Sequence, residues 1–148
     1  MKKNRGFSLL EVMVTLVIVS LGLLGVAGLI ANSLKYNQSA YARTQATWFA
    51  NEIIDQMRAN RTTATGAAHP YDIAKGAAAP TGTSIPETDV RNWLAEIQAS
   101  LPSGKASIES NKPSAGMVTV TIDWDDSSRL ATGAVVTGSG TLAIETRL

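Results

Sequence analysis

The first third of the chain is dominated by one long apolar segment. Between residues 7 and 34 the only charged side chain is Glu11, and the run from Val12 to Ala31 approaches the roughly 20 apolar residues with which an α-helix crosses a bilayer. Three basic residues come directly before it, namely Lys2, Lys3 and Arg5. Because positive residues beside a span stay on the cytoplasmic side, we expect a single-pass helix that places everything after Asn32 across the membrane.

The helical pattern continues beyond the apolar segment to about Arg61. This part contains neither Pro nor Gly and keeps an apolar stripe at helical spacing. The stripe comprises Ala42, Ala46, Phe49, Ala50, Ile53 and Met57. We therefore expect one helix over residues 7–61, with a transmembrane part over about 7–31 and an amphipathic part over 32–61. Gly22, Gly25 and Gly28 each cost about 1 kcal/mol of helix propensity relative to Ala, so we expect helix flexibility there.

The remaining residues, 62–148, have the patterns of a small separate domain. Residues 62–86 are rich in Ala, Gly, Thr and Pro, which is typical of an irregular connector. A short amphipathic helix is expected within residues 86–104, with its apolar side formed by Val90, Trp93, Leu94, Ile97 and Leu101. Alternation then predicts strands over 106–110, 117–124 and 142–148. The expected fold class is α+β, with the long helix packed on a small antiparallel sheet.

The junction between basic and apolar residues carries the most specific motif, Gly6-Phe7-Ser8-Leu9-Leu10-Glu11. It resembles the type IV prepilin signature, in which a peptidase removes the leader, here residues 1–6, by cutting after the glycine. The resemblance implies N-methylation of Phe7, the new first residue. Glycine suits the cut because, without a Cβ, it lets the backbone take an extended or strained geometry in a peptidase. We expect any larger residue at position 6 to slow processing.

Glu11 is unusual because it is a carboxylate just inside a transmembrane segment. Insertion scales put the cost of such a residue at about 2.5–3.5 kcal/mol, and such residues normally have partners. The α-amino group of Phe7, from the same or a neighbouring subunit, is the expected cation. In the family a neighbour is thought to supply it, which makes Glu11 an assembly and register residue. Ser8 and Glu11 also match a capping box at a helix start, an interpretation compatible with the first.

Leader removal also changes the charge of the chain. The full sequence has a formal net charge of +1, and cleavage after Gly6 removes three positive side chains, which leaves −2.

The segment that follows the apolar run extends the resemblance to type IV minor pilins of the PilV type, the pilus modification proteins. The matching positions are Asn37, Gln38, Ser39, Ala40, Tyr41, Arg43, Gln45, Ala46, Ala50, Ile53, Asp55, Met57, Arg58, Ala59 and Asn60. The resemblance implies a subunit that takes part in pilus assembly and initiation and reaches the pilus tip. It places the protein in the inner membrane, with a periplasmic C-terminal domain. It also implies that the subunit is incorporated in the pilus at the cell surface.

The resemblance also implies a set of partners. They are the prepilin peptidase with its N-methyltransferase activity, other minor pilins, the major pilin, the inner-membrane assembly platform and a tip adhesin.

Two alternatives remain open at this point. The pseudopilins of type II secretion share the cleavage motif and the long helix. A secreted or periplasmic protein with an ordinary export signal, cut near Gly25-Val26-Ala27, is a different class. Such signals have an uninterrupted apolar stretch of about 7–15 residues, whereas this segment is longer and begins with an acid.

Other functional classes find little support in the composition. The chain has no cysteine, one histidine and a near-neutral charge, so we expect no catalytic site, no cofactor, no metal site and no nucleic-acid partner. His69 and Asp72 lie in the connector without a nucleophile motif. The spacing of Asp123, Asp125 and Asp126 lacks the later Gly and Glu of a calcium loop, so we expect a solvated strand end and turn.

Overall fold

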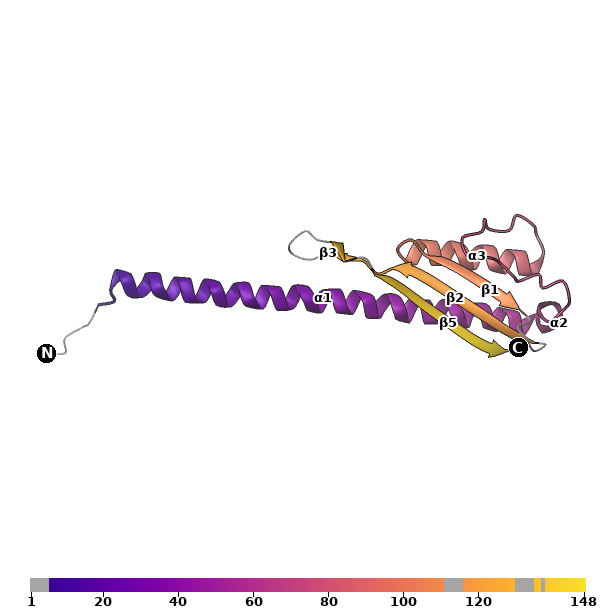
Figure 1. Ribbon diagram of the computed structural model, residues 1–148, viewed down its shortest axis with the longest axis horizontal. Helices are drawn as coiled ribbons and strands as arrows, with labels where there is room; N and C mark the ends of the chain where they lie inside the picture. Colours follow the sequence, from indigo (N-terminus) through magenta and orange to yellow (C-terminus); the bar gives the residue numbers. More distant parts are fainter. Residues whose placement is uncertain (1–5, 111–115, 130–134, 137) are drawn as a thin grey trace. The chain divides into compact units, whose positions relative to one another are not determined.

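The computed structural model describes residues 6–110, 116–129, 135–136 and 138–148 (Figure 1). The basic cluster Lys2, Lys3 and Arg5 therefore lies outside the described residues. The helices are α1 (Leu9–Ala59), α2 (Arg61–Ala64) and α3 (Ile85–Ser100). The strands are β1 (Lys105–Ser110), β2 (Met117–Asp125), β3 (Ser128–Arg129), β4 (Val135–Val136) and β5 (Ser139–Arg147). The chain divides into two compact units, one ending at Gln38 and the other comprising Ser39–Leu148.

The first unit is the N-terminal part of α1. Helix α1 continues without a break through Gly22, Gly25 and Gly28, and a Cβ added to any of the three would meet no atom within 4 Å. No packing within the described chain therefore requires these glycines. The flexibility expected from them stays a prediction.

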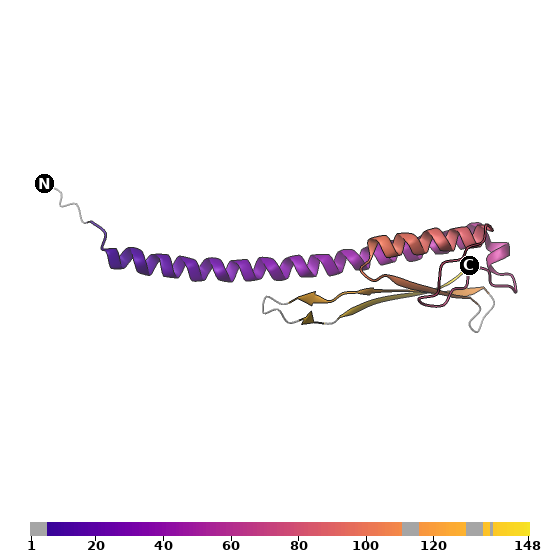
Figure 2. The same cartoon turned by 90° about the horizontal axis from the view of Figure 1, so that it is seen from above.

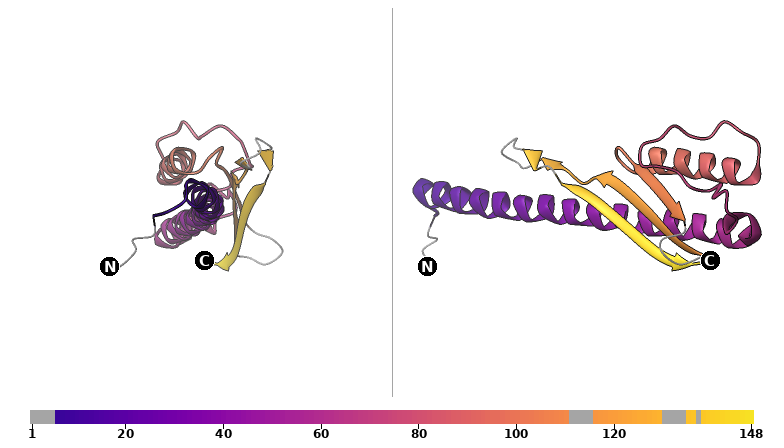
Figure 3. Two further views of the ribbon diagram at one scale, coloured as in Figure 1. Left: turned by 90° about the vertical axis from the view of Figure 1, so that its left-hand side faces the viewer. Right: turned by 45° about the vertical axis from the view of Figure 1, so that its right-hand side comes forward.

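The second unit contains a three-stranded antiparallel sheet in the order β1-β2-β5. The register places Ile108 of β1 opposite Val120 of β2, and Val120 opposite Ile144 of β5. Strands β3 and β4 form a separate two-stranded ladder at the far end of the β2–β5 hairpin. Two layers result, because α3 and the part of α1 after Ser39 lie together on one face of the sheet (Figures 2 and 3). The α+β fold with a long helix packed on an antiparallel sheet is confirmed.

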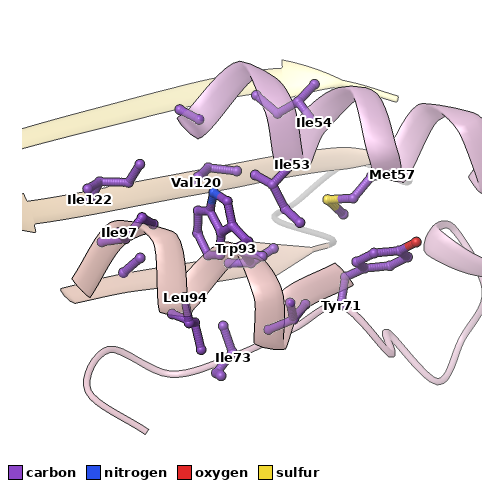
Figure 4. Packing of buried hydrophobic residues seen from close by; sticks show 14 of the residues in the cluster. Ile53, Ile54, Met57, Tyr71, Ile73, Trp93, Leu94, Ile97, Val120 and Ile122 are labelled. Atoms are coloured by element: carbon purple, nitrogen blue, oxygen red, sulfur yellow. The ribbon is translucent and has the colours of Figure 1, made fainter. Parts of the chain in front are cut away.

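One apolar core joins the two layers. Along α1 the expected stripe is buried at Ala46, Ala50, Ile53 and Met57, while Ala42 and Phe49 are partly buried against it. The expected apolar side of α3 is buried together with Leu101, just beyond its end. Trp93 fills the space between the helices and the sheet (Figure 4), and its indole Nε1–H donates to the Phe49 carbonyl at 2.8 Å. Trp93 and Trp124 are core residues, whereas Trp48 is 65% exposed.

The connector is more ordered than its composition predicts. It contains α2, and Tyr71 is fully buried beside Met57 (Figure 4). Ile73 exchanges two backbone hydrogen bonds with Ile108, both 3.0 Å long, and so extends the β1 edge of the sheet. The prediction of an irregular connector was wrong for α2 and for the bridge at Ile73, and the other residues between α2 and α3 form turns and irregular structure, as expected. The side chains of Tyr71 and Ile73 anchor the connector to the core.

Helix α3 begins where the sequence contains a local start signal. Ser84 is its N-cap, Pro86 lies in the first turn, and Glu87 completes a capping box by accepting from the Ser84 backbone N–H at 3.2 Å. The Ser84 hydroxyl also donates to the Glu87 carboxylate. These bonds lower the pKa of Glu87, because they stabilise its charged form.

Candidate processing site and membrane segment

The residues of the cleavage motif lie at the beginning of α1. The Ser8 Oγ accepts from the Leu10 backbone N–H at 3.3 Å, and the Ser8 carbonyl accepts from the N–H of Glu11 at 3.1 Å. Ser8 therefore acts as the N-cap of the helix. Gly6 and Phe7 precede the helix, and Phe7 is 85% exposed. The peptide bond between Gly6 and Phe7 is thus non-helical and accessible, as a peptidase substrate must be.

No contact within the described chain requires glycine at position 6. A Cβ built there meets no heavy atom within 4 Å, and Gly6 does not have the positive φ that favours glycine. Its small size serves no packing purpose in this fold. A requirement for glycine at this position would therefore come from another molecule that handles the segment.

The Glu11 carboxylate is exposed on the first turn of the helix. Over residues 6–110, 116–129, 135–136 and 138–148, no ion pair or side-chain hydrogen bond of this carboxylate is found. The Ser8 half of a capping box is present, but the return bond from Glu11 to the Ser8 N–H is not found in that part of the chain. Helix capping therefore leaves the Glu11 carboxylate available.

The neighbouring polar side chains of the apolar segment behave differently from Glu11. The Thr15 hydroxyl donates to the Glu11 carbonyl at 2.6 Å, and the Ser20 hydroxyl donates to the Leu16 carbonyl at 2.7 Å. Such bonds satisfy a hydroxyl inside the helix itself, without water. A carboxylate needs a cation instead, so Glu11 alone among these three side chains needs a partner from elsewhere.

Helix α1 contains a segment long and apolar enough to cross a membrane. An 18-residue window within Leu9–Ala59 has a mean hydropathy of 2.5, and none of this window is buried. Large apolar side chains, from Phe7 and Leu9 to Leu34, are exposed along it. Water-soluble proteins rarely expose apolar patches of this extent. Together with the prepilin-type motif, the segment therefore indicates membrane anchoring.

Comparison with known proteins assigns a class to this N-terminal region. The family model described as prokaryotic N-terminal methylation motif matches residues 1–27, which include Gly6, Phe7 and Glu11. Neither a curated protein nor a solved structure matches the chain. The motif and the long helix on a small antiparallel sheet support a type IV pilin-like protein.

The other polar residues considered in the sequence serve the fold. The Asp72 Oδ1 accepts from the Ser110 backbone N–H at 2.9 Å, and the Asp72 backbone N–H donates to the His69 carbonyl at 2.9 Å. Asp126 accepts from the Ser39 hydroxyl at 2.8 Å and ties the β2–β5 hairpin to α1. No group of three or more His, Cys, Asp or Glu side chains able to hold a metal occurs in the described part of the chain.

Asp123 corrects the prediction of a solvated strand end. Its side chain is only 19% exposed, and its Oδ2 lies 2.6 Å from the Lys75 Nζ, while its Oδ1 accepts from the Thr141 hydroxyl at 2.6 Å. Burial alone would raise the pKa of Asp123, but the bonds from Lys75 and Thr141 and the charges of Lys75 and Lys105 together lower it. Asp123 is therefore a structural ion-pair residue that fastens the connector to the sheet.

The role of Tyr71 as a structural anchor was not predicted from the sequence. Its hydroxyl donates to the Asp89 Oδ2 at 2.9 Å and accepts from the Asn60 Nδ2 at 3.2 Å. Burial, followed by the bond and charge of Asp89, raises the pKa of Tyr71 despite the opposing bond from Asn60. A lone aromatic residue among small ones was the available signal, since a large side chain in such a segment usually has a buried site.

Proposed function

We propose that this chain is a minor pilin of the PilV type that takes part in type IV pilus assembly and initiation. In this proposal the leader is cut after Gly6, Phe7 is N-methylated, and the mature protein is held in the inner membrane by α1. The domain after Asn32 lies in the periplasm until the subunit joins the pilus. The observation that carries the proposal is the methylation motif over residues 1–27, with Glu11 lacking a cation in the described chain.

The proposed chemistry pairs Glu11 with a neighbour's new N-terminus. Cleavage frees the α-amino group of Phe7, which is a compact cation at the start of an exposed helix. An anchored Glu11 carboxylate in low-dielectric lipid attracts such a cation much more strongly than in water. The pair sets the axial position of one helix beside another, so Glu11 acts as a register residue. The chain is then a substrate of the peptidase and methyltransferase and not itself an enzyme.

The assignment to PilV-type minor pilins is a separate step from the assignment to the pilin-like class. It depends on the resemblance over residues 37–60, the segment that continues α1 out of the apolar region. The absence of cysteine argues against a major shaft subunit, because many major pilins close their C-terminal region with a disulfide. Other minor pilins, the major pilin, the assembly platform and a tip adhesin are the partners that this assignment brings with it.

Mass spectrometry of the mature protein tests the proposal directly. We expect a first residue of Phe7 carrying one methyl group, and loss of this species in cells without the prepilin peptidase. A mature chain that begins near Gly28 would instead identify an ordinary export signal and overturn the proposal. The peptide covering residues 7–27 distinguishes the two outcomes in a single digest.

Deletion of the gene separates the minor pilin from the type II secretion pseudopilin. We expect fewer surface pili and unchanged protein secretion. Loss of secretion with normal piliation would assign the chain to the secretion system. In either case re-expression of the wild-type chain provides the control.

A further inference from the structure

The sheet has one edge closed by the chain and one edge that the described chain leaves unpaired. On the β1 side, Ile73 pairs with Ile108, and the carboxylate of Asp72 accepts from the Ser110 backbone N–H. On the other side, β5 is the last strand in the order β1-β2-β5 (Figure 1). The connector thus protects one edge, while β5 is nine residues long with no strand beyond it among the described residues.

The backbone hydrogen bonds at the two ends of β5 define which residues face that free edge. Leu148 N–H donates to the Gly116 carbonyl, and Asp126 N–H donates to the Gly138 carbonyl, both at 2.9 Å. In an antiparallel pair, residues alternate between those that bond to the neighbour and those that do not. The even-numbered residues of β5 therefore bond to β2. The odd-numbered residues turn their N–H and C=O groups to the free edge, and these are Ser139, Thr141, Ala143, Glu145 and Arg147.

The helix-facing side of β5 is incompletely covered. Leu142 and Ile144 are only partly buried against the core, whereas Val120 and Ile122 of the adjacent β2 are fully buried. One further strand beyond β5 would extend the sheet over this region and cover both side chains. Its helix-facing residues would have to be apolar, because they would lie beside Leu142 and Ile144.

The opposite side of β5 adds a charge requirement. Glu145 and Arg147 are both exposed on the outer face, and opposite charges facing each other across strands stabilise pairing by about 0.2–1 kcal/mol. The strand contains no Pro and no Lys, and its backbone has no positive-φ residue. Pro, Lys and a positive-φ bulge, with which proteins usually block an edge strand, are therefore missing from β5, and the charges of Glu145 and Arg147 restrict pairing to a strand of complementary charge.

The geometry points to β5 as a strand-addition site for an extended segment of another pilin-like subunit. This segment has apolar residues on its helix-facing side, a basic residue opposite Glu145 and an acidic residue opposite Arg147. The inference relies on the proposed function for the identity of the partner. A second copy of this chain fits less well, because antiparallel pairing of two β5 strands would make the two Ser39–Ala59 helices run in opposite directions. Subunits anchored through their N-termini in one membrane run in the same direction.

A peptide experiment on the full processed chain in detergent tests the edge itself. The probe is the peptide Glu-Val-Lys-Val-Thr-Val-Thr, which in antiparallel pairing sets its Lys opposite Glu145 and its Glu opposite Arg147. The control peptide exchanges the Lys and the Glu. Backbone amide hydrogen exchange is measured residue by residue along β5.

Without peptide, the odd-numbered amides from 141 to 147 should exchange fast and the even-numbered ones slowly. With the matched peptide, we expect the odd-numbered amides to slow by on the order of tenfold or more, and the exchanged-charge peptide to protect them several-fold less. Ala143→Pro removes one outward N–H and should abolish the protection, while Ala143→Thr should retain it. If the matched peptide leaves the exchange of the odd-numbered amides unchanged, β5 is not a strand-addition site.

A crosslinking experiment in cells tests the partner. A photoreactive residue at position 143 should crosslink to a β-alternating segment of an identified pilin-like subunit. A crosslink to β5 of a second copy, or no crosslink in cells where the subunit is assembled, would overturn the partner assignment. The mature N-terminus is measured in the same cells. If Phe7 is methylated but β5 forms no crosslink, the inference about β5 is wrong and the proposed function still holds. If the mature protein lacks the apolar segment, the proposed function itself is wrong.

Discussion

At the scale of single residues, the proposed role of Glu11 is in assembly and not in membrane insertion. Its neighbours Thr15 and Ser20 satisfy their hydroxyls on the helix backbone, but the Glu11 carboxylate has no cation in the described chain. We predict that Glu11→Gln leaves cleavage after Gly6 largely intact and lowers incorporation into pili severalfold, because the amide is neutral and cannot pair with an α-amine. Immunoblots of sheared pili and of membranes measure the two effects.

Thr15→Val is the matched control for Glu11, since it alters a polar residue one turn further along the same helix. We expect normal incorporation for this control. Normal incorporation of Glu11→Gln as well would reject the pairing of Glu11 with a neighbour's N-terminus.

Gly140 lies opposite Trp124 in the β2–β5 register, and the indole occupies the space that a side chain at position 140 would need. A Cβ at position 140 would overlap the Trp124 ring, and Trp124 is only 2% exposed. We predict that Gly140→Ala lowers the free energy of unfolding by about 1–3 kcal/mol, the usual range for overpacking a core. Denaturant unfolding of the full chain in detergent measures the change.

A double-mutant cycle identifies the cause of this loss. In a Trp124→Val background the added methyl group has room, so Gly140→Ala should cost much less there than in the wild type. Equal costs in both backgrounds would show that the strand backbone, and not the indole, excludes a side chain at position 140.

At the scale of elements, Tyr71 joins the end of α1, the connector and α3. Its hydroxyl accepts from Asn60 just beyond α1 and donates to Asp89 of α3. We predict that Tyr71→Phe lowers the free energy of unfolding by about 1 kcal/mol, because two polar partners lose their bond in a part-buried site. Tyr41→Phe is the control, since Tyr41 is 61% exposed, and it should change stability by a few tenths of a kcal/mol at most. Equal effects of the two changes would contradict the anchoring role.

The ion pair between Lys75 and Asp123 fastens the connector to β2 and should make stability depend on pH. The pKa of Asp123 is lowered from its ordinary value of 3.8. A lowered pKa in the folded state stabilises the fold above pH 3.8, and this contribution is lost as the pH falls through the folded value. We predict that Asp123→Asn costs on the order of 1 kcal/mol at pH 7 and almost nothing once Asp123 is protonated in the wild type.

Unfolding of the two proteins at pH 7 and at pH 3 and below measures this difference. The separation between the wild type and Asp123→Asn should shrink as the pH falls. A separation that stays constant with pH would mean that Asp123 acts through its shape and not through its charge.

A continuous apolar run predicted the first part of the long helix. Hydrophobic periodicity predicted its second part, the short helix and the three strands of the main sheet, because each of these packs one side against a single core. The Val118, Val120, Ile122 and Trp124 alternation shows this directly, since all four side chains are buried. The connector could not be predicted in the same way. Tyr71, Ile73 and Lys75 are ordered by Asp89, Ile108 and Asp123, which lie 18 to 48 residues further along the chain, and no local pattern encodes such contacts.

The candidate site was predictable to a different degree from the fold. Gly6, Phe7 and Glu11 form a local motif, so the sequence alone locates it. The unpaired edge of β5 depends on strand order and on the phase of its hydrogen bonds, which only the folded chain defines. Local chemistry is therefore visible in the sequence, whereas a surface made by the meeting of distant strands is not.

At the scale of the whole molecule, the proposed topology requires the N-terminus and the domain after Asn32 to lie on opposite sides of the inner membrane. Because the chain contains no cysteine, one introduced thiol reports its own location without background. Ala95 is exposed on α3, so Ala95→Cys should leave the fold intact. We predict that a membrane-impermeant maleimide labels this thiol in cells whose outer membrane alone is permeabilised. A cytoplasmic cysteine-containing protein in the same cells should be labelled only after lysis. If position 95 were labelled only after the inner membrane is broken, the domain after Asn32 would lie in the cytoplasm and the proposed topology would be wrong. In that case β5 could not reach other pilin-like subunits on the periplasmic side.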